Sequence, residues 1–216
     1  LVADLQERLP AEAPSYFLLD IPPADFDGLK DRVSRHIPGA TLVEAPMLRG
    51  RIVALKGKPV EELTFPADTQ WVLNSDRGLS YSETVPEGSS VSGGTWWAKD
   101  YSGPPLVSFE GEIAKKLGIG LGDSITVNVL GRNIEAKVAS TRDVKWESIA
   151  LNFIMVFSPN TLRAAPHNLL ATVRLPPGGA PGAESDMVRD LGRAYPGVSA
   201  IRVRDAIDQF SKIFAK

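Results

Sequence analysis

The sequence predicts an α+β fold in which two β-α-β units flank a β-rich insert. Residues 16–44 and 169–203 share one order of features: an apolar strand, a Pro-Pro pair, an amphipathic helix, a Pro-Gly dipeptide and a β-branched strand. The segment between them is rich in Gly, Pro and Ser and has short strand-like runs. One β-α-β unit cannot bury its apolar face alone, so we expect the two to share a sheet or to pack as a pseudo-symmetric pair. We interpret them as a structural duplication, with independently arising turns as the alternative.

The helix of each β-α-β unit is predicted from an apolar stripe at helical spacing. The stripes are Phe26, Leu29, Val33 and Ile37 in the first unit and Met187, Val188, Leu191 and Tyr195 in the second. Acidic residues come early in both helices, and Arg35 and His36 come late in the first, as the helix dipole favours.

The predicted insert alternates between short strands and turns. "RIVALKG" and "TQWVLN" suggest strands, and "PLVSFEGEIAKKLGI" a strand followed by a short helix that ends at Gly118. "SITVNV" and "NIEAKVAS" predict a hairpin around "LGR", and the apolar run "LNFIMVFSP" a buried strand. We therefore assign residues 1–55 and 151–216 to the β-α-β part and residues 56–150 to the insert.

Both ends of the chain are predicted to be amphipathic helices. The first places Leu1, Val2, Leu5 and Leu9 on one side, and the last carries Ile207, Phe210, Ile213 and Phe214 after a capping Asp205. Because the first residue is Leu and not Met, we expect the chain to be a processed or excised piece of a longer protein.

Composition excludes several classes of function. The 216 residues carry a net charge of -2 with the basic residues spread along the chain, which argues against a nucleic-acid surface. There is no cysteine, so disulfides, thiolate zinc sites and thiol catalysis are all absent. No stretch approaches the ~20 apolar residues that span a bilayer.

The glycines of "LGIGLGDS" do not form a phosphate-binding loop. Such a loop needs a Lys and a Ser or Thr after its last glycine, at the start of a helix. Here Gly122 is followed by Asp123 and then by a predicted strand, so an anion would meet a carboxylate. We interpret Gly118 as a helix C-cap and Gly122-Asp123 as a turn.

No catalytic constellation is evident, and we predict no enzymatic activity, cofactor or metal. The two histidines, His36 and His167, are far apart, and no G-x-S-x-G nucleophile motif is present. The carboxylate pairs that could serve a glycosidase are interpreted as solvated surface charge. They are Glu110 with Glu112 and Asp143 with Glu147.

Two adjacent tryptophans are the candidate contact for a ligand or partner. In a strand, one ring of Trp96-Trp97 would face inward and the other outward, where it could stack on a sugar, a lipid or a protein. The alternative is that one ring is core and the other covers a neighbouring loop. Trp71 and Trp146 are predicted to be packing residues.

Residues 85–162 carry a resemblance to a known family. The matching features are "GGTWW", "PLVSFEGEIAKKLGI", Gly122-Asp123, "GR" at 131–132, "ASTRDV" with Trp146 and Ser148, and "NFIMVFSP". Together they resemble the extracytoplasmic domain of ABC-transporter permeases of the MacB/FtsX/LolC type, and within it the YbbP-type branch. In this family, the domain lies between two membrane spans and has a porter part of β-α-β units with an inserted sabre part.

The resemblance implies a mechanical role at an inner membrane. A separate cytoplasmic ATPase subunit would move the membrane helices of the permease, and this periplasmic domain would transmit the motion to export or extraction of a hydrophobic or lipid-like substrate. A periplasmic partner protein is a further expectation, and a nucleic-acid partner is not. Coupling would run through Leu5, Leu9, Phe210, Ile213 and Phe214. The features that match do not select a substrate.

Two rival hypotheses remain open. An extracytoplasmic enzyme or carbohydrate-binding module would use Trp96 and Trp97 as a stacking platform and would have no flanking membrane spans. A partner-docking domain would be tethered to the membrane without an ATPase.

Overall fold

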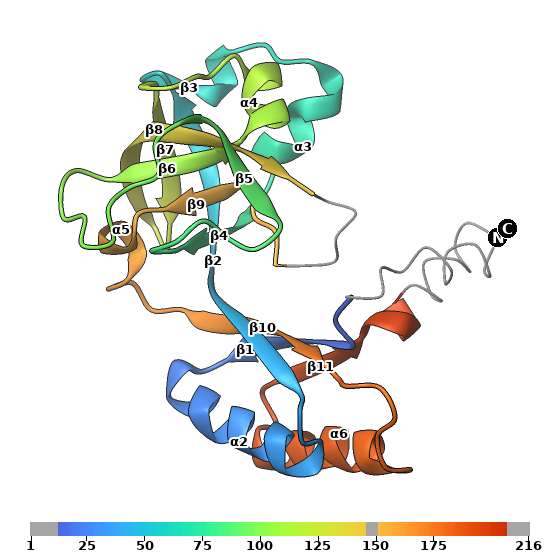
Figure 1. Ribbon diagram of the computed structural model, residues 1–216. Coiled ribbons are helices and arrows are strands. Elements are labelled where there is room, and N and C mark those ends of the chain that lie inside the picture. The colour runs from blue at the N-terminus through green and yellow to red at the C-terminus, as the bar shows by residue number, and fades with distance from the viewer. Residues whose placement is uncertain (1–12, 146–150, 207–216) are drawn as a thin grey trace, which may run out of the picture. The chain divides into compact units, whose positions relative to one another are not determined.

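The computed structural model describes residues 13–145 and 151–206, which belong to two compact units (Figure 1). The α/β unit comprises Leu1–Ala45, Glu147–Leu151 and Asn168–Lys216, and the barrel unit comprises Pro46–Trp146 and Asn152–His167. The insert predicted at residues 56–150 is therefore bounded differently: residues 46–55 and 152–167 also belong to the barrel unit. The reason is that strands from both of these segments are needed to close the barrel.

The α/β unit has the element order β-α-β-β-α-β. Its elements are β1 (Tyr16–Ile21), the 3₁₀ turn η1 (Pro23–Asp25), α2 (Phe26–His36), the first residues of β2 (Thr41–Leu55), β10 (Asn168–Arg174), α6 (Ala183–Ala194) and β11 (Ser199–Arg202). The strand order is β11-β1-β10-β2, and β1 runs antiparallel to β10 and β11. The two β-α-β units thus interleave in one sheet, in the split β-α-β arrangement.

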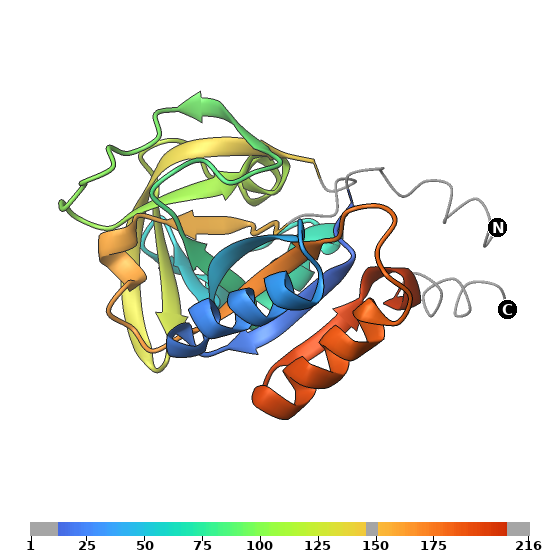
Figure 2. The ribbon, with the colours of Figure 1, turned by 60° about the horizontal axis from the view of Figure 1, so that its bottom comes forward.

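Helices α2 and α6 supply the core of the α/β unit (Figure 2). Leu29 and Val33 of α2 and Met187 and Leu191 of α6 are buried together with alternate residues of β1 and β10. The helical stripes predicted from the sequence are therefore confirmed as the buried faces.

An ionic cluster joins the two helices at the edge of this core. The carboxylate of Asp190 on α6 accepts hydrogen bonds from Arg32 Nη1 at 2.8 Å and from His36 Nε2 at 2.9 Å, both on α2. Arg32 also lies over the ring of Tyr195, 5.9 Å from its centroid. The hydrogen bonds from His36 and then Arg32 hold the pKa of Asp190 below its usual range.

The barrel unit is a closed ring of strands. Its elements are the rest of β2, β3 (Lys58–Pro59), η2 (Val60–Glu62), η3 (Ala67–Thr69), α3 (Gln70–Leu73), β4 (Arg77–Tyr81), β5 (Ser89–Gly94), β6 (Leu106–Glu110), α4 (Gly111–Leu117), β7 (Ser124–Val129), β8 (Arg132–Val144), β9 (Met155–Phe157) and α5 (Pro159–Leu162). Pairing runs β2-β4-β9-β6-β8-β7 and returns to β2, so these strands leave no free edge in the ring. Strand β5 adds to β8 outside the ring.

Three local predictions for the insert are confirmed. β7 and β8 form the hairpin around Leu130 and Gly131, both at positive φ, and β9 is fully buried. Helix α4 ends at Gly118 in the left-handed conformation. The prediction for "TQWVLN" was wrong, because this run forms the end of η3 and helix α3.

A buried arginine ties four strands of the barrel unit together. Arg142 on β8 is 0% exposed, and its Nη2 donates to the carbonyl oxygens of Phe153 at 2.8 Å and Ile154 at 3.1 Å, just before β9. Its Nε donates to Ser108 Oγ on β6 at 3.0 Å, and its Nη1 to Ser89 Oγ on β5 at 3.1 Å. The guanidinium therefore replaces its hydration shell with oxygens from three neighbouring segments.

Burial lowers the pKa of Arg142 to about 10, while the nearby carboxylate of Glu110 favours the charged form. Arg142 thus stays protonated at neutral pH, and the desolvation of its charge is offset by its hydrogen bonds.

We predict that Arg142→Met destabilises the chain by about 2–4 kcal/mol, because the buried carbonyl oxygen of Phe153 loses this donor while that of Ile154 keeps the N–H of Glu110. Arg142→Lys should lose less stability than Arg142→Met but more than the control, since an ammonium lacks the planar set of N–H groups that donates to several segments at once. Urea unfolding followed by circular dichroism measures both. The matched control is Arg132→Met at the exposed start of β8, which should stay within about 0.5 kcal/mol of the parent. Equal stability of Arg142→Met and the parent would contradict the prediction.

The lowered pKa of Asp190 gives a second prediction. The carboxylate of Asp190 has a lower pKa in the folded chain than in the unfolded chain, where it is about 4. Its contribution to stability is therefore fully present above the unfolded-state pKa, and it is lost as the pH falls through the folded-state pKa. Asp190→Asn should therefore lower Tm near neutral pH, and the difference from the parent should shrink as the pH falls below about 4. Asp31→Asn is the control, because Asp31 on α2 pairs with Arg35 on an exposed face outside the cluster. A deficit of Asp190→Asn that stays constant with pH would refute this.

Candidate functional site

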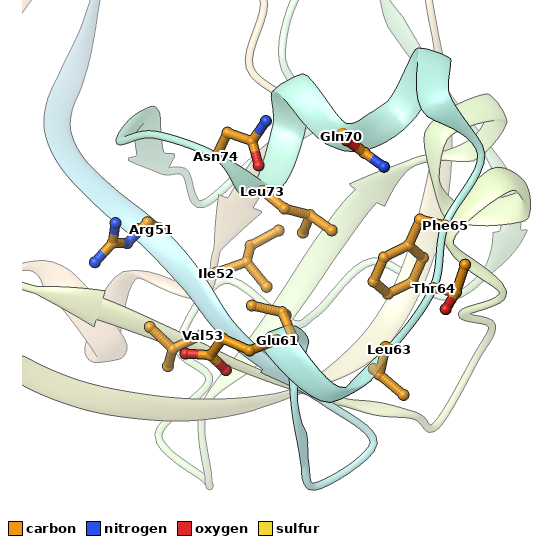
Figure 3. A pocket seen from close by; sticks show the side chains of 11 residues that line it. Arg51, Ile52, Val53, Glu61, Leu63, Thr64, Phe65, Gln70, Leu73 and Asn74 are labelled. Carbon is orange, nitrogen blue, oxygen red and sulfur yellow. The ribbon is translucent and has the colours of Figure 1, made fainter.

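A cavity of about 510 Å³ opens on the barrel unit between β2, α3 and the chain that joins them (Figure 3). Its lining has an apolar part and a polar part. The apolar residues are Ile52, Val53, Val60, Leu63, Phe65 and Leu73, and the polar ones are Arg51, Glu61, Thr64, Gln70 and Asn74. An apolar floor with polar groups around it is typical of sites for small ligands or for apolar segments of a partner.

The floor of this cavity is continuous with the barrel core. Ile52 and Leu73 are buried, and Phe65 is half-buried against the same core cluster. In Figure 3 the side chains of Ile52, Leu73 and Phe65 point toward the middle of the cavity, whereas Arg51 points away from it. Apolar groups that enter the cavity would therefore lie against core side chains of its floor.

Two prolines shape the wall opposite β2. Pro59 precedes η2 and Pro66 precedes η3, and both have extended φ and ψ values that start a new turn. Thr69 closes the second turn by donating from Oγ1 to the carbonyl oxygen of Pro66 at 2.7 Å. The residues between the two turns are thereby held along the cavity.

Sequence reasoning missed this cavity. "TQWVLN" was treated as a strand, although Thr69, Val72 and Leu73 are the buried residues and have the i, i+3, i+4 spacing of a helix. That spacing, together with the turn residues before it, is the signal that could have found α3. No comparable signal in the sequence brings β2 to the other side of the cavity.

The tryptophan pair lies outside any strand, unlike the prediction. Strand β5 ends at Gly94, whose φ of 75° turns the chain and where an added Cβ would collide with the carbonyl oxygen of Ala139. The rings of Trp96 and Trp97 lie in contact, with centroids 4.2 Å apart and planes tilted by 36°. Both are therefore on the same side of the chain rather than on opposite faces of a strand.

Both indole N–H groups of the pair are occupied. Trp97 is buried and donates to the carbonyl oxygen of Ser82 at 2.8 Å, and the half-buried Trp96 donates to that of Glu83 at 2.9 Å. The pair thus fastens its segment to the loop after β4. What Trp96 still offers to a ligand is part of a ring face, without a polar handle.

Two other sequence predictions need correction. Trp71 was predicted to be a packing residue, but it is 48% exposed on α3 and lies under the guanidinium of Arg77, 5.4 Å from its Cζ. Glu110 was predicted to be solvated, but it is 3% exposed and accepts from the backbone N–H groups of Glu112 and Ile113. Glu110 is therefore the N-cap of α4.

The histidines and glycines have structural partners. His167 Nδ1 lies 2.7 Å from the carbonyl oxygen of Ala165, and its Nε2 lies 3.0 Å from Tyr81 Oη. The carboxylate of Asp123 accepts from the N–H of Gly120 at 2.8 Å, which confirms the turn interpretation of the glycine-rich segment. Among residues 13–145 and 151–206, no group of three or more His, Asp or Glu side chains could hold a metal ion.

The predicted coupling residues Leu5, Leu9, Phe210, Ile213 and Phe214 lie outside the described residues, as do Glu147 and Trp146. The first and last segments that the structure describes are in contact. Val203 N donates to the carbonyl oxygen of Ser15 at 3.0 Å, so the first and last described segments meet. Within the described part of the chain, no helix is both long enough and apolar enough to cross a membrane.

The chain was compared with known proteins by sequence and by fold. No protein-family model matches the chain. Over 209 residues it is 30% identical to YbbP of Escherichia coli K12, described as an uncharacterized ABC transporter permease, and the match covers 94% of this chain and 23% of YbbP. The chain thus spans about a quarter of the length of that relative.

A solved structure has the same fold. The periplasmic region of MacB from Actinobacillus actinomycetemcomitans aligns with a TM-score of 0.50 at 12% sequence identity, over 96% of this chain and 98% of that one. By sequence the chain is similar to part of an ABC transporter permease, and its fold is that of the periplasmic region of MacB.

Proposed function

We propose that this chain transmits the motion of the membrane helices of an ABC permease to the export or extraction of a hydrophobic or lipid-like substrate. A cytoplasmic ATPase subunit would drive the motion, and the chain itself would have no enzymatic activity. The observation that carries the proposal is the hydrogen bond between Val203 N and the carbonyl oxygen of Ser15, which joins the first and the last described segments. A domain inserted between two membrane spans needs its ends next to each other.

Ser15 links the two chain ends to three strands. Its N–H donates to the carbonyl oxygen of Val173 on β10 at 2.7 Å, and its Oγ accepts from Leu175 N at 3.4 Å. Val203 directly follows β11, and Ser15 directly precedes β1. A displacement of Ser15 or Val203 would therefore act on the α/β sheet through β1, β10 and β11.

The α/β unit is proposed to be the porter part of the permease domain and the barrel unit its sabre part. The interleaved β-α-β units support a duplication within the porter part, because each contributes one helix to the same core. Leu5, Leu9, Phe210, Ile213 and Phe214 are the proposed coupling residues beyond the sheet. A partner protein in the periplasm would contact the barrel unit.

The substrate class is proposed from the cavity of the barrel unit. Its floor of Ile52, Phe65 and Leu73 favours an apolar group, and the cavity has no charged side chain in that floor. The relatives do not identify the substrate.

This proposal predicts that nucleotide changes the distance between the two units in the intact permease complex. The distance is measured in the reconstituted complex by pulsed electron paramagnetic resonance between two spin labels. One label is at Leu130→Cys, on the exposed tip of the β7–β8 hairpin, and the other is at Gly197→Cys, after α6. The chain has no cysteine of its own. We expect the distance distribution to shift between the nucleotide-free and the vanadate-trapped states.

The coupling residues give the matched comparison. Phe210→Asp should abolish the distance change while the ATPase subunit stays bound, whereas the conservative Phe210→Leu should retain the change. If the distance distribution in the parent complex is the same in the nucleotide-free and vanadate-trapped states, transmission of motion by this chain is ruled out.

The alternative function, a carbohydrate-binding module built on Trp96 and Trp97, makes a different prediction. Because Trp97 is buried and both indole N–H groups are occupied, we expect no saturable fluorescence change when the 216-residue chain is titrated with β-linked or α-linked gluco-oligosaccharides. A saturable change that disappears in Trp96→Ala would favour the carbohydrate-binding function instead.

A further inference from the structure

A second cavity, of about 420 Å³, lies within the α/β unit. Its walls come from the chain before β1, the Gly- and Pro-rich loop between β10 and α6, the start of α6 and the chain after β11. The volume is within the range of about 300–1,000 Å³ that small-molecule sites occupy. The proposed function does not use this cavity.

One side of this cavity is apolar. Ile37, Leu175, Pro176 and Ala183 line it, and Ile37, Leu175 and Ala183 belong to or pack against the core of the α/β unit. The loop that completes this side has glycines at 178 and 179, so no side chain from these positions narrows the opening. This side can hold carbon chains close to the core without exposing them to water.

The charged side chains of the lining are Glu184, Arg202 and Arg204. Tyr16 Oη donates to Glu184 Oε1 at 2.5 Å. Burial and this hydrogen bond raise the pKa of Tyr16, so the hydroxyl stays protonated and remains a donor to Glu184. The carboxylate keeps further lone pairs that can accept from a hydroxyl.

The two arginines lie on the adjoining segment. Arg202 is the cross-strand neighbour of Tyr16, and its Nε lies 3.4 Å from Asp205 Oδ2. Arg204 has no ion-pair partner among the described residues. The lining therefore carries an excess positive charge, and Arg204 holds the guanidinium that is free to bind an anion.

The described segments nearest the two chain ends, Ala13–Ser15 and Arg202–Arg204, are among the walls of the cavity. We propose that it binds the phosphodiester headgroup of an anionic membrane lipid, with Arg204 and Arg202 on the phosphate and the apolar side against the glycerol and first acyl carbons. This inference rests on the proposed function, because the membrane spans that would continue from the two ends would hold the cavity at the bilayer surface. A headgroup hydroxyl would donate to Glu184.

The test is flotation of the 216-residue chain with phosphatidylglycerol vesicles at about 0.15 M salt, a concentration that screens diffuse surface attraction. We expect binding to these vesicles and little binding to phosphatidylcholine vesicles, which lack both net charge and a headgroup donor. Arg204→Gln should weaken binding by about five- to tenfold. Circular dichroism verifies that the variant is folded.

The matched control is Arg193→Gln, an exposed arginine in the last turn of α6 in the same unit. It should change binding by less than about twofold. Equal losses in Arg193→Gln and Arg204→Gln would mean diffuse electrostatic attraction and would overturn the site. Absence of flotation with the parent chain would overturn it as well.

Two further arms identify the source of the phosphate. Displacement from the vesicles by millimolar inorganic phosphate would indicate a site for the free anion and would overturn the lipid assignment. Binding of soluble dihexanoyl phosphatidylglycerol without binding to vesicles would indicate a free amphiphile, and would also overturn it. Either failure leaves the nucleotide-driven distance change in the intact permease as a separate question, so the two proposals fail independently.

Discussion

The barrel unit depends on one buried cation. The guanidinium of Arg142 lies where β5, β6, β8 and the approach to β9 meet, and it donates to a hydroxyl or carbonyl oxygen on three of these segments. An aliphatic side chain could fill the same volume, but the carbonyl oxygens of Phe153 and Ile154 would then be buried without this donor. β9 pairs with β4 and β6 in the ring, and the guanidinium satisfies carbonyl oxygens of the chain that leads into it.

The α/β unit is stabilised in a different way, through two amphipathic helices on an interleaved sheet and an ionic cluster at Asp190. The first and last described segments meet beside its sheet at Ser15 and Val203, and its second cavity borders the same segments. The features proposed for coupling and for lipid contact are therefore gathered in one unit. The apolar cavity proposed for the substrate belongs to the other.

Features that depend on a few neighbouring residues could be predicted from the sequence, and features that depend on distant contacts could not. The helical stripes of α2 and α6, the β7–β8 hairpin and the Gly118 cap were found because each depends on a few neighbouring residues. The apolar floor at Ile52 and Phe65 was not found, because the run that adds Leu73 to it resembles a strand locally although it folds as α3. Glu110 was misjudged for a similar reason: a carboxylate that caps a helix and faces a buried arginine has the same local sequence context as a solvated one.

The order of the strands along the chain means that the barrel unit can be completed before the α/β unit during synthesis or export. Every strand of the ring ends by Phe157, whereas β10, α6 and β11 of the α/β unit all follow it. The barrel can therefore close while β1 and α2 still lack the strand and helix that bury their apolar faces. For a chain delivered from its N-terminus, the segment before the barrel is thus the one that depends longest on protection from aggregation.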